Sequence, residues 1–519
     1  MRVRASLFLF VLAAMAMTAG SARPASTAEE QTARYFESIR HDPLLLLAFL
    51  RDMPKGGDLH NHLSGAIYAE SYVEFAARDG VCVDRKTLAL SPPPCDEVAG
   101  RPLASEAWKD AVLYRQMIDA FSMRHFVPGA ESAHDHFFDA FGKFGLVSRA
   151  HTGEMLAEVT ARAAEEHVSY LELIVAIDRS EAALLGARLG WDDDLSRFRE
   201  KLLSNGLAHV VAASRQYLDA SEAKMRELLR CQSAHPDAGC SVLVRYQYEI
   251  YRGFPPEQVF AQTLGGFEVA QVDSRVAGIN MVMPEDGYIS MRDFSLHMRM
   301  LEFLHRQYPR VRISLHAGEL APGLVPPEGL RFHIRESVER GHAERIGHGV
   351  DVMHERDPMA LLREMAERKV LVEICLSSND MILGIRGSQE PLMMYMHQGV
   401  PVALATDDPG VARSSMTGEY QRAVETYNLG YAELKKMTRD SLEYSFIPGT
   451  SLWAADSRQR REASACASEK PAAQTTSSGC QGALAKSERA RAQWGLEAAF
   501  ARFEQKYSQR NAPSGVNQR

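Results

Sequence analysis

Seven residues of the types that bind metals or transfer protons lie toward the ends of apolar runs of this sequence. They are His60, His62, His316, Glu319, His348, Asp407 and Asp408. Three neutral imidazoles and one carboxylate form a ligand set that suits Zn²⁺ and leaves a coordination position open to water. Zinc lowers the pKa of bound water to about 7, so such a site would supply a nucleophile at neutral pH. The residue types therefore predict a hydrolytic metal site.

Spacing distinguishes the pair His60 and His62 from a second pair, His134 and His136. The first pair lies in a strand pattern, where side chains two residues apart point the same way and can share one ion. The second pair lies in a helical pattern, where they diverge by about 200°. We expect that pair to lie on a helix face or to make a single substrate contact. The predicted zinc ligands are His60, His62, His316 and Asp407, and the candidates for proton transfer and substrate orientation are Glu319, His348 and Asp408.

Eight short apolar runs alternate with helical patterns, which is typical of strands buried on both faces of a sheet. The runs are 56–63, 168–176, 241–250, 276–283, 311–319, 345–352, 370–378 and 400–408. The alternation predicts an α/β fold, a (β/α)₈ TIM barrel, although a doubly wound open sheet would show the same alternation. In a barrel the carboxyl ends of the strands share one face, which would bring the candidate residues together.

The segments outside this alternation predict additions to the barrel. Residues 64–167 are too many for one crossover helix and contain a proline-rich stretch between two cysteines. We therefore predict an insertion after the first strand, at about 80–110, followed by helices over the barrel mouth. The predicted organisation is a signal peptide at 1–22, a helical lead-in at 23–53, the barrel at 54–450, and a C-terminal helical extension with a disordered tail at 451–519.

The N-terminus has the three parts of a secretory signal peptide. Arg2 and Arg4 precede an apolar run of eleven residues, 7–17, and small residues follow at 20–22. The run is too short to span a bilayer, so cleavage and export are predicted, with a secreted or periplasmic location and no membrane insertion afterwards. An uncleaved membrane anchor and a buried helix are the alternatives.

Export makes disulfides possible, and six of the seven cysteines form close pairs in the sequence. The predicted disulfides are Cys82–Cys95, Cys231–Cys240 and Cys466–Cys480. Cys375 is left over in an apolar run and is predicted to be a buried free thiol. The alternative is that all seven are reduced.

The charge pattern limits the classes of partner. The net charge is −8, and no basic block suggests nucleic acid, so a small-molecule partner is expected. The oligomeric state is left open, with a homodimer as one possibility.

Four motifs in this order resemble the signatures of the adenosine deaminase family. They are "LHNHLSGAI", "LHAGE", "ERIGHG" and "TDDP", and the resemblance covers about residues 50 to 450. The signal peptide, the stretch "MPKGG" and the insertion are similar to the secreted, growth-factor-type branch of that family. The resemblance implies a (β/α)₈ barrel with one Zn²⁺ per chain.

The resemblance also implies a role for each site residue. His60, His62, His316 and Asp407 would hold the zinc. Protonated Glu319 would donate to N1 of a purine, His348 would orient the attacking hydroxide at C6, and Asp408 would bind N7. The implied function is that of an exported zinc-dependent aminohydrolase acting on a 6-aminopurine nucleoside, first of all adenosine, which would give inosine and ammonia.

Two positions depart from the family pattern at the substrate-binding residues. Ser64 stands where the compact enzymes have an aspartate that holds the ribose 5′-hydroxyl, and Met283 is the nearest match to a glycine that contacts purine N3. Leu376 replaces a frequent proline. Deamination is therefore better supported than adenosine as the substrate. The alternatives are a zinc hydrolase of another aminated heterocycle or an amide, and a catalytically silent extracellular binding protein. A binuclear site is disfavoured because 276–283 contains no lysine.

Overall fold

The computed structural model describes most of the chain. The described residues are 26–453, 465, 466, 469, 471 and 477–510. The predicted signal peptide at 1–22 and the predicted disordered tail after residue 510 lie outside them. No helix of the described part is both long and apolar enough to cross a membrane.

Eight parallel strands form the central sheet, and they pair in the order of the sequence. They are β1 (Gly56–His62), β4 (Val168–Val175), β5 (Leu243–Tyr251), β6 (Val276–Val282), β7 (Arg312–Ala317), β8 (Arg345–His348), β9 (Leu371–Ile374) and β10 (Val402–Leu404). In a doubly wound sheet the order of the strands reverses at the first strand, so some neighbouring strands are not consecutive in the sequence. Here the eight strands are neighbours in sequence order, which confirms the predicted (β/α)₈ barrel.

The barrel closes at candidate site residues. The residue pair Asn61 and Asp407 forms a parallel bridge between β1 and the segment after β10. The His62 N–H donates to the Asp407 carbonyl at 3.0 Å, and the Asp407 N–H donates to the His60 carbonyl at 2.9 Å. Barrel closure therefore fixes the backbone of three predicted ligands relative to one another.

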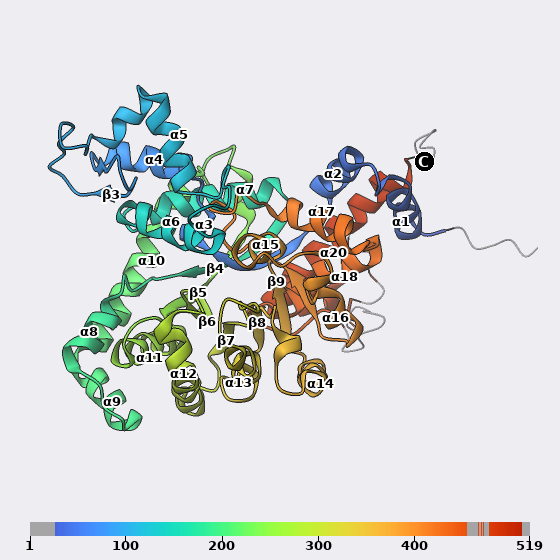
Figure 1. The fold of residues 1–519 in the computed structure, drawn as a ribbon. Helices are drawn as coiled ribbons and strands as arrows, with labels where there is room; N and C mark the ends of the chain where they lie inside the picture. The colour runs from blue at the N-terminus through green and yellow to red at the C-terminus, as the bar shows by residue number, and fades with distance from the viewer. Residues whose placement is uncertain (1–25, 454–464, 467–468, 470, 472–476, 511–519) are drawn as a thin grey trace, which may run out of the picture.

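Helices surround the strands, as Figure 1 shows. Those after β4 are α8 (Glu181–Leu189), α9 (Leu195–Leu202), α10 (Ala208–Leu228), α11 (Pro256–Val272), α12 (Tyr288–Gln307), α13 (His333–Glu339), α14 (Pro358–Arg368), α15 (Leu376–Leu383), α16 (Leu392–His397), α17 (Met416–Tyr427) and α18 (Tyr431–Glu443). Helix α14 shows why they begin where they do. The Asp357 side chain accepts from the Ala360 N–H, and Pro358 occupies the first turn, where its missing N–H costs nothing.

The last predicted strands are shorter than their apolar runs. The run 370–378 is a strand only to Ile374, and α15 begins at Leu376. The prediction of a strand through 378 is therefore wrong. The helix start is stabilised because the Ser377 N–H, which has no partner within the helix, donates to Glu419 Oε2 at 3.1 Å. As a result Ser378 and Asn379 lie on a helix at the barrel mouth.

The segment between β1 and β4 forms a separate layer of helices with a small hairpin. It contains α3 (Leu63–Ala66), α4 (Ala69–Arg78), β2 (Cys82–Val83), β3 (Leu90–Ser91), α5 (Ala111–Ala120), α6 (Ala133–Ser148) and α7 (Thr152–Glu165). Strands β2 and β3 pair antiparallel. Figure 1 shows α3, α4, α5 and α6 on one side of the strands.

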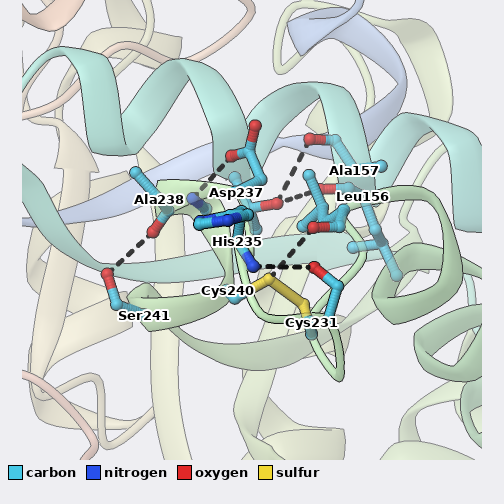
Figure 2. Close-up of a disulfide and its surroundings, with 12 residues drawn as sticks. Leu156, Ala157, Cys231, His235, Asp237, Ala238, Cys240 and Ser241 are labelled. Carbon is cyan, nitrogen blue, oxygen red and sulfur yellow. Dashed lines mark hydrogen bonds between the residues drawn. A yellow bond between two sulfur atoms is a disulfide. The ribbon is translucent and has the colours of Figure 1, made fainter.

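The three predicted disulfides are confirmed. They join Cys82 to Cys95, Cys231 to Cys240, and Cys466 to Cys480. Cys375 is a buried free cysteine, also as predicted. Figure 2 shows the Cys231–Cys240 disulfide, which closes the loop after α10, beside Leu156 and Ala157 of α7.

The helices at the two ends of the described chain pack together. They are α1 (Ala28–Ile39), α2 (Pro43–Asp52), α19 (Ser478–Lys486) and α20 (Glu488–Ser508). Helix α1 lies along α20 in Figure 1, and the Thr32 hydroxyl donates to the Glu504 carbonyl at 3.2 Å. Lys435 of α18 contacts Glu504 Oε1 at 2.5 Å, so α20 is also tied to the barrel layer.

Lys55, in the stretch "MPKGG" before β1, joins two parts of the fold. Its side chain is fully buried, and Nζ donates to the carbonyls of Leu50, Met53 and Glu166. Two of these acceptors are at the end of α2, where helix carbonyls have no intrahelical partner. Lys55 therefore fastens the lead-in helix to the residues that precede β4.

Candidate active site

Four polar side chains converge at the carboxyl ends of β1, β7 and β10. His316 Nε2 lies 2.9 Å from His60 Nε2 and 3.0 Å from His62 Nε2. Asp407 Oδ1 lies 3.4 Å from His60 Nε2 and 3.3 Å from His62 Nε2. The four residues predicted as ligands are therefore brought together, and their donor atoms form one group that could hold a metal ion.

Hydrogen bonds behind this group fix the imidazole tautomers. Asn280 Nδ2 donates to Gln247 Oε1 at 2.9 Å, so the Asn280 oxygen faces His316 Nδ1 at 2.8 Å. His316 Nδ1 must then carry the hydrogen, and its Nε2 presents a lone pair to the group. His60 Nδ1 likewise donates to Glu373 Oε2 at 2.8 Å.

The donor set fits one zinc-type cation. Nitrogen lone pairs facing one another at about 3 Å repel unless a cation or a proton lies between them. Ligands about 2.0–2.1 Å from a tetrahedral zinc are about 3.3 Å from one another, and the observed separations of 2.9–3.4 Å surround that value. The Ser378 hydroxyl donates to Asp407 Oδ2, which leaves Oδ1 directed at the group.

Burial and the two carboxylates set the protonation of these histidines. Burial lowers the pKa of His62 to about 3 and lowers the pKa of His316 well below its usual value, so both are in the neutral form that binds metal. Burial also disfavours charge on His60, but Asp407 and Glu373 outweigh it and raise its pKa to about 10. A proton on His60 Nε2 and a divalent cation compete for the same place.

Glu319 and His348 lie beside the four donors. His348 Nε2 is 3.7 Å from Glu319 Oε1, and both residues are buried. Asn379 Nδ2 donates to Glu390 Oε2, so its oxygen accepts from His348 Nδ1 at 2.9 Å. His348 Nε2 is then an acceptor that faces the site. Burial raises the pKa of Glu319, which favours the protonated form.

Glu285 holds the backbone of Glu319 in place. Its two carboxylate oxygens accept from the Gly318 N–H at 3.1 Å and the Glu319 N–H at 2.9 Å. Burial opposes ionisation of Glu285, but Arg252 and His333 outweigh it and lower its pKa to about 2. A carboxylate anchored in this way gives Glu319 a fixed starting point.

Asp408 lies against the glycine of the first motif. A Cβ atom at Gly65 would be 1.5 Å from Asp408 Oδ1, so only glycine allows this approach. Burial and the neighbouring Asp407 raise the pKa of Asp408 well above its usual range. Asp408 Oδ1 is buried and has no hydrogen-bond partner among the described residues, which leaves it able to bind a ligand.

Three site residues have left-handed backbone conformations. The φ angles are 85° at Met283, 68° at His348 and 60° at Asp407. Non-glycine residues rarely adopt this region, and such positions gather at active sites. At Met283 the conformation is the one that favours glycine, which accounts for the glycine expected there from the family resemblance.

A cavity of about 560 Å³ opens above the four donors. Its floor contains His62, His316, Glu319, Asp407 and Asp408, and its opposite wall is formed by Phe137, Phe138, Phe141 and Phe144 of α6. Ser64 and Met283, which were predicted to bind substrate, also line it. Aromatic rings facing a polar floor are suited to a flat heterocycle with one reactive edge.

His134 and His136 have separate partners. His134 Nε2 lies 3.1 Å from Asp286 Oδ1, and His136 Nε2 lies 3.1 Å from the Asp119 carbonyl. The structure therefore does not bring them together as a chelating pair, as the helical spacing indicated.

Several site residues escaped the sequence analysis. Glu373 and Asn280 fix two histidines, Asn379 fixes His348, and Glu249 lines the cavity. Glu373 and Asn280 could have been found from the sequence, because each is a polar residue inside an apolar strand run. A buried polar side chain in a strand requires a partner, and in these two cases the partner is a predicted ligand.

The fold is a TIM barrel, and its site gathers four donor residues that could hold a metal ion. A sequence model of the adenosine deaminase family matches residues 223–453. The chain is 24% identical over 408 residues to an adenosine deaminase of Clostridium perfringens, with 76% of this chain and 95% of the relative covered. An adenine deaminase of Rhizobium leguminosarum bv. trifolii is 30% identical over 137 residues, but this match spans 39% of the relative and 26% of this chain.

Solved structures show the same fold. An amidohydrolase from Burkholderia ambifaria with bound Zn superposes with a TM-score of 0.51 at 17% identity, covering 78% of this chain and 88% of the other. Arabidopsis ADAL complexed with GMP gives 0.50 at 18% identity, covering 77% and 94%. At this identity the likeness supports the barrel alone. The sequence matches and the site motifs make the chain similar to the adenosine deaminase family, and they support an enzyme of the hydrolytic deaminase class.

Proposed function

We propose that the protein is an exported, zinc-dependent deaminase that converts a 6-aminopurine nucleoside, first of all adenosine, into the 6-oxo purine and ammonia. The observation that carries the proposal is the four-donor group His60, His62, His316 and Asp407 at the floor of a cavity with an aromatic wall. The purine relatives support the substrate class, since the C. perfringens and R. leguminosarum proteins are named for adenosine and adenine.

The residues around the four donors supply the remaining chemistry. A zinc ion held there would lower the pKa of water at its open position to about 7. His348 Nε2 faces the same space as an acceptor and can orient that water or take its hydrogen. Purine N1 and N7 are acceptors, so Glu319 and Asp408 must each carry a hydrogen in order to bind them.

Transfer of a proton from Glu319 to N1 makes C6 more electrophilic while water adds there and gives one hydrogen to His348. That hydrogen passes to the amino group, the C6–N bond breaks and ammonia leaves. The remaining hydroxyl hydrogen on C6 returns to Glu319, and the ring keeps a 6-oxo group with a hydrogen on N1. An aromatic amine is a poor leaving group, so ring protonation and addition have to be coupled. Glu319 is positioned for that coupling because it lies 3.7 Å from His348 and beside Asp407.

A second candidate is hydrolysis of another aminated heterocycle or an amide on the same site. Ser64 and Met283 favour it, because both stand in the cavity where the family pattern has nucleoside-binding residues. A panel that includes aminated pyrimidines separates this candidate from the first, since the four donors and Glu319 would serve both reactions.

Export is part of the proposal and is supported by the signal-like N-terminus and by three disulfides. Mass analysis of the mature protein from the exported fraction checks it. The expected N-terminus lies just after residue 22. A mature chain that begins at Met1 in the cytoplasmic fraction would contradict export.

The central experiment measures ammonia release by zinc-supplemented protein from 6-aminopurine bases, nucleosides and nucleotides. Adenosine is expected to be among the substrates, and metal analysis is expected to give one zinc per chain. The proposal fails if no 6-aminopurine releases ammonia, or if the protein binds two zinc ions or none.

A further inference from the structure

The substrate cavity has a second polar end, formed by the carboxyl ends of β4 and β5. A smaller pocket of about 80 Å³ adjoins the main cavity there. The two spaces share Ser64, Ser148, Arg149, Glu249 and Tyr251. None of these residues is among the four donors or has been given a role in the reaction, so this end is available for the part of the substrate that does not react.

Strand register places Glu249 on the cavity side. Gln247, two residues earlier on β5, points into the barrel, where its Oε1 accepts from Asn280. Side chains two residues apart share a face, so Glu249 points the same way. In the strand register, Gln247 of β5 pairs with Ile174 of β4, and Ile174 pairs with His62 of β1. Glu249 therefore lies roughly 7 Å beyond the level of His62 along the strand, which is comparable with the length of a fused two-ring base.

Glu249 has acceptor capacity that the protein leaves unused. Within the described chain, its carboxyl group has only the Ala176 N–H as a hydrogen-bond donor. Burial, reinforced by Asp178, raises its pKa to about 8, although Arg149 opposes the shift. Glu249 is only partly buried and lines both cavities, so its free acceptor positions can pair with a ligand that supplies hydrogens.

We propose that Glu249 binds the vicinal 2′- and 3′-hydroxyls of the substrate's ribose and so makes the site select ribonucleosides over free bases. The two carboxyl oxygens can hydrogen-bond to two neighbouring hydroxyls at once, with a protonated oxygen donating and the other accepting, while a base without its sugar makes neither contact. This inference rests on the proposed function, because it assumes that the reacting ring binds at the four donors.

The test compares kcat/KM for adenosine, 2′-deoxyadenosine and adenine in three proteins. These are the wild type, Glu249→Gln and Glu249→Ala. In Glu249→Ala, kcat/KM for adenosine is expected to fall about 10- to 100-fold, mostly through KM, because the hydrogen bonds to both ribose hydroxyls are removed. The loss of kcat/KM for 2′-deoxyadenosine should be smaller, and kcat/KM for adenine should be unchanged. The Gln variant keeps the shape and tests the result if the Ala variant does not fold.

Glu181→Ala is the matched control, since Glu181 is an exposed glutamate at the start of α8. It should leave all three values unchanged. Equal losses on the three substrates, with lowered zinc content or thermal stability, would assign Glu249 a structural role and overturn the inference. If the wild type acts on adenosine but the Glu249 variants leave the ratios of kcat/KM between the substrates unchanged, the inference is wrong and the proposed function stands. If the wild type acts on none of the three, the proposed function fails as well.

Discussion

The floor of the substrate cavity and the wall opposite it are built in different ways. The floor comes from the ends of β1, β7 and β10, and several of its side chains have a hydrogen-bond partner behind them, such as Asn280 behind His316. The opposite wall comes from α6, in the segment inserted between β1 and β4, and presents rings of phenylalanine with few hydrogen bonds. The floor is rigid and specified by the barrel, whereas the wall depends on an added helix.

This difference indicates a division between reactivity and selectivity. Reaction requires donor atoms held to within a fraction of an ångström, which strand ends and supporting hydrogen bonds provide. Selection of a substrate requires shape and a few polar contacts, which inserted helices and loops can provide without disturbing the barrel. Changes on the floor should therefore lower kcat, and changes on the wall should raise KM.

The largest effect is expected from Glu319→Gln. The variant keeps the shape and a hydrogen-bond donor but cannot transfer a proton, so kcat should fall by more than the roughly 10²–10⁴-fold typical of a general acid. Zinc content and substrate binding should be retained. Steady-state kinetics and metal analysis of the same preparation check this.

Glu328→Gln is a matched control for that variant, since Glu328 is exposed and lies nine residues further along the chain. It should have wild-type activity. If Glu319→Gln keeps most of its activity, or loses zinc together with activity, then Glu319 has only a supporting role and the distinction between floor and wall weakens.

A smaller effect is expected from Asn280→Ala, which removes the acceptor behind His316 Nδ1. Loss of such a partner typically lowers metal affinity or activity by about 10- to 100-fold. Competition with a chelator measures the zinc affinity directly. Asn205→Ala, at an exposed position between α9 and α10, is the control and should bind zinc as the wild type does. Unchanged zinc affinity and activity in Asn280→Ala would mean that His316 is held without this hydrogen bond.

Much of the floor could be predicted because its signals are local. Apolar runs identified the strands, and the two-residue spacing of His60 and His62 placed them on one face. Close spacing in the sequence also paired the six cysteines correctly. In each case the decisive contact lies within a few residues along the chain or follows from the regular order of the barrel.

The supporting contacts could not be predicted because they join distant residues. Glu373 is 313 positions from His60, and only the closed barrel brings them together. Backbone conformation at strand ends was equally hidden, since nothing local requires Met283 or Asp407 to be left-handed. The aromatic wall lay in a segment whose helices were expected over the barrel mouth, but which of their side chains would line the cavity depended on packing.

On the opposite wall, Phe141→Ala should act mainly on KM. Removing an aromatic ring from the cavity should raise KM about tenfold, on the scale of 1–3 kcal/mol for a hydrophobic contact, with kcat little changed. Leu146→Ala on the same helix is the matched control, because Leu146 is 44% exposed and does not line the cavity. A large fall in kcat with unchanged KM would show that the wall also positions the reacting atoms.

The smallest effect is expected when the ribose 5′-hydroxyl is removed from the substrate. Ser64 replaces the aspartate that the family pattern places at this hydroxyl, and it lines the cavity as a small neutral residue. A buried carboxylate would be left unpaired by the absence of the hydroxyl, whereas a serine hydroxyl can rotate toward water or another acceptor. The kcat/KM for 5′-deoxyadenosine should therefore be within about tenfold of the value for adenosine, far from the 10⁴-fold rejection seen where a site is built around a substrate hydroxyl.

Paired kinetic measurements on the two nucleosides, with Ser64→Asp as a variant that restores the family residue, check this. Ser64→Asp should increase the preference for adenosine. A loss of a hundredfold or more in the wild type would mean that another residue of the cavity has taken over the contact, and that the wall is as specific as the floor.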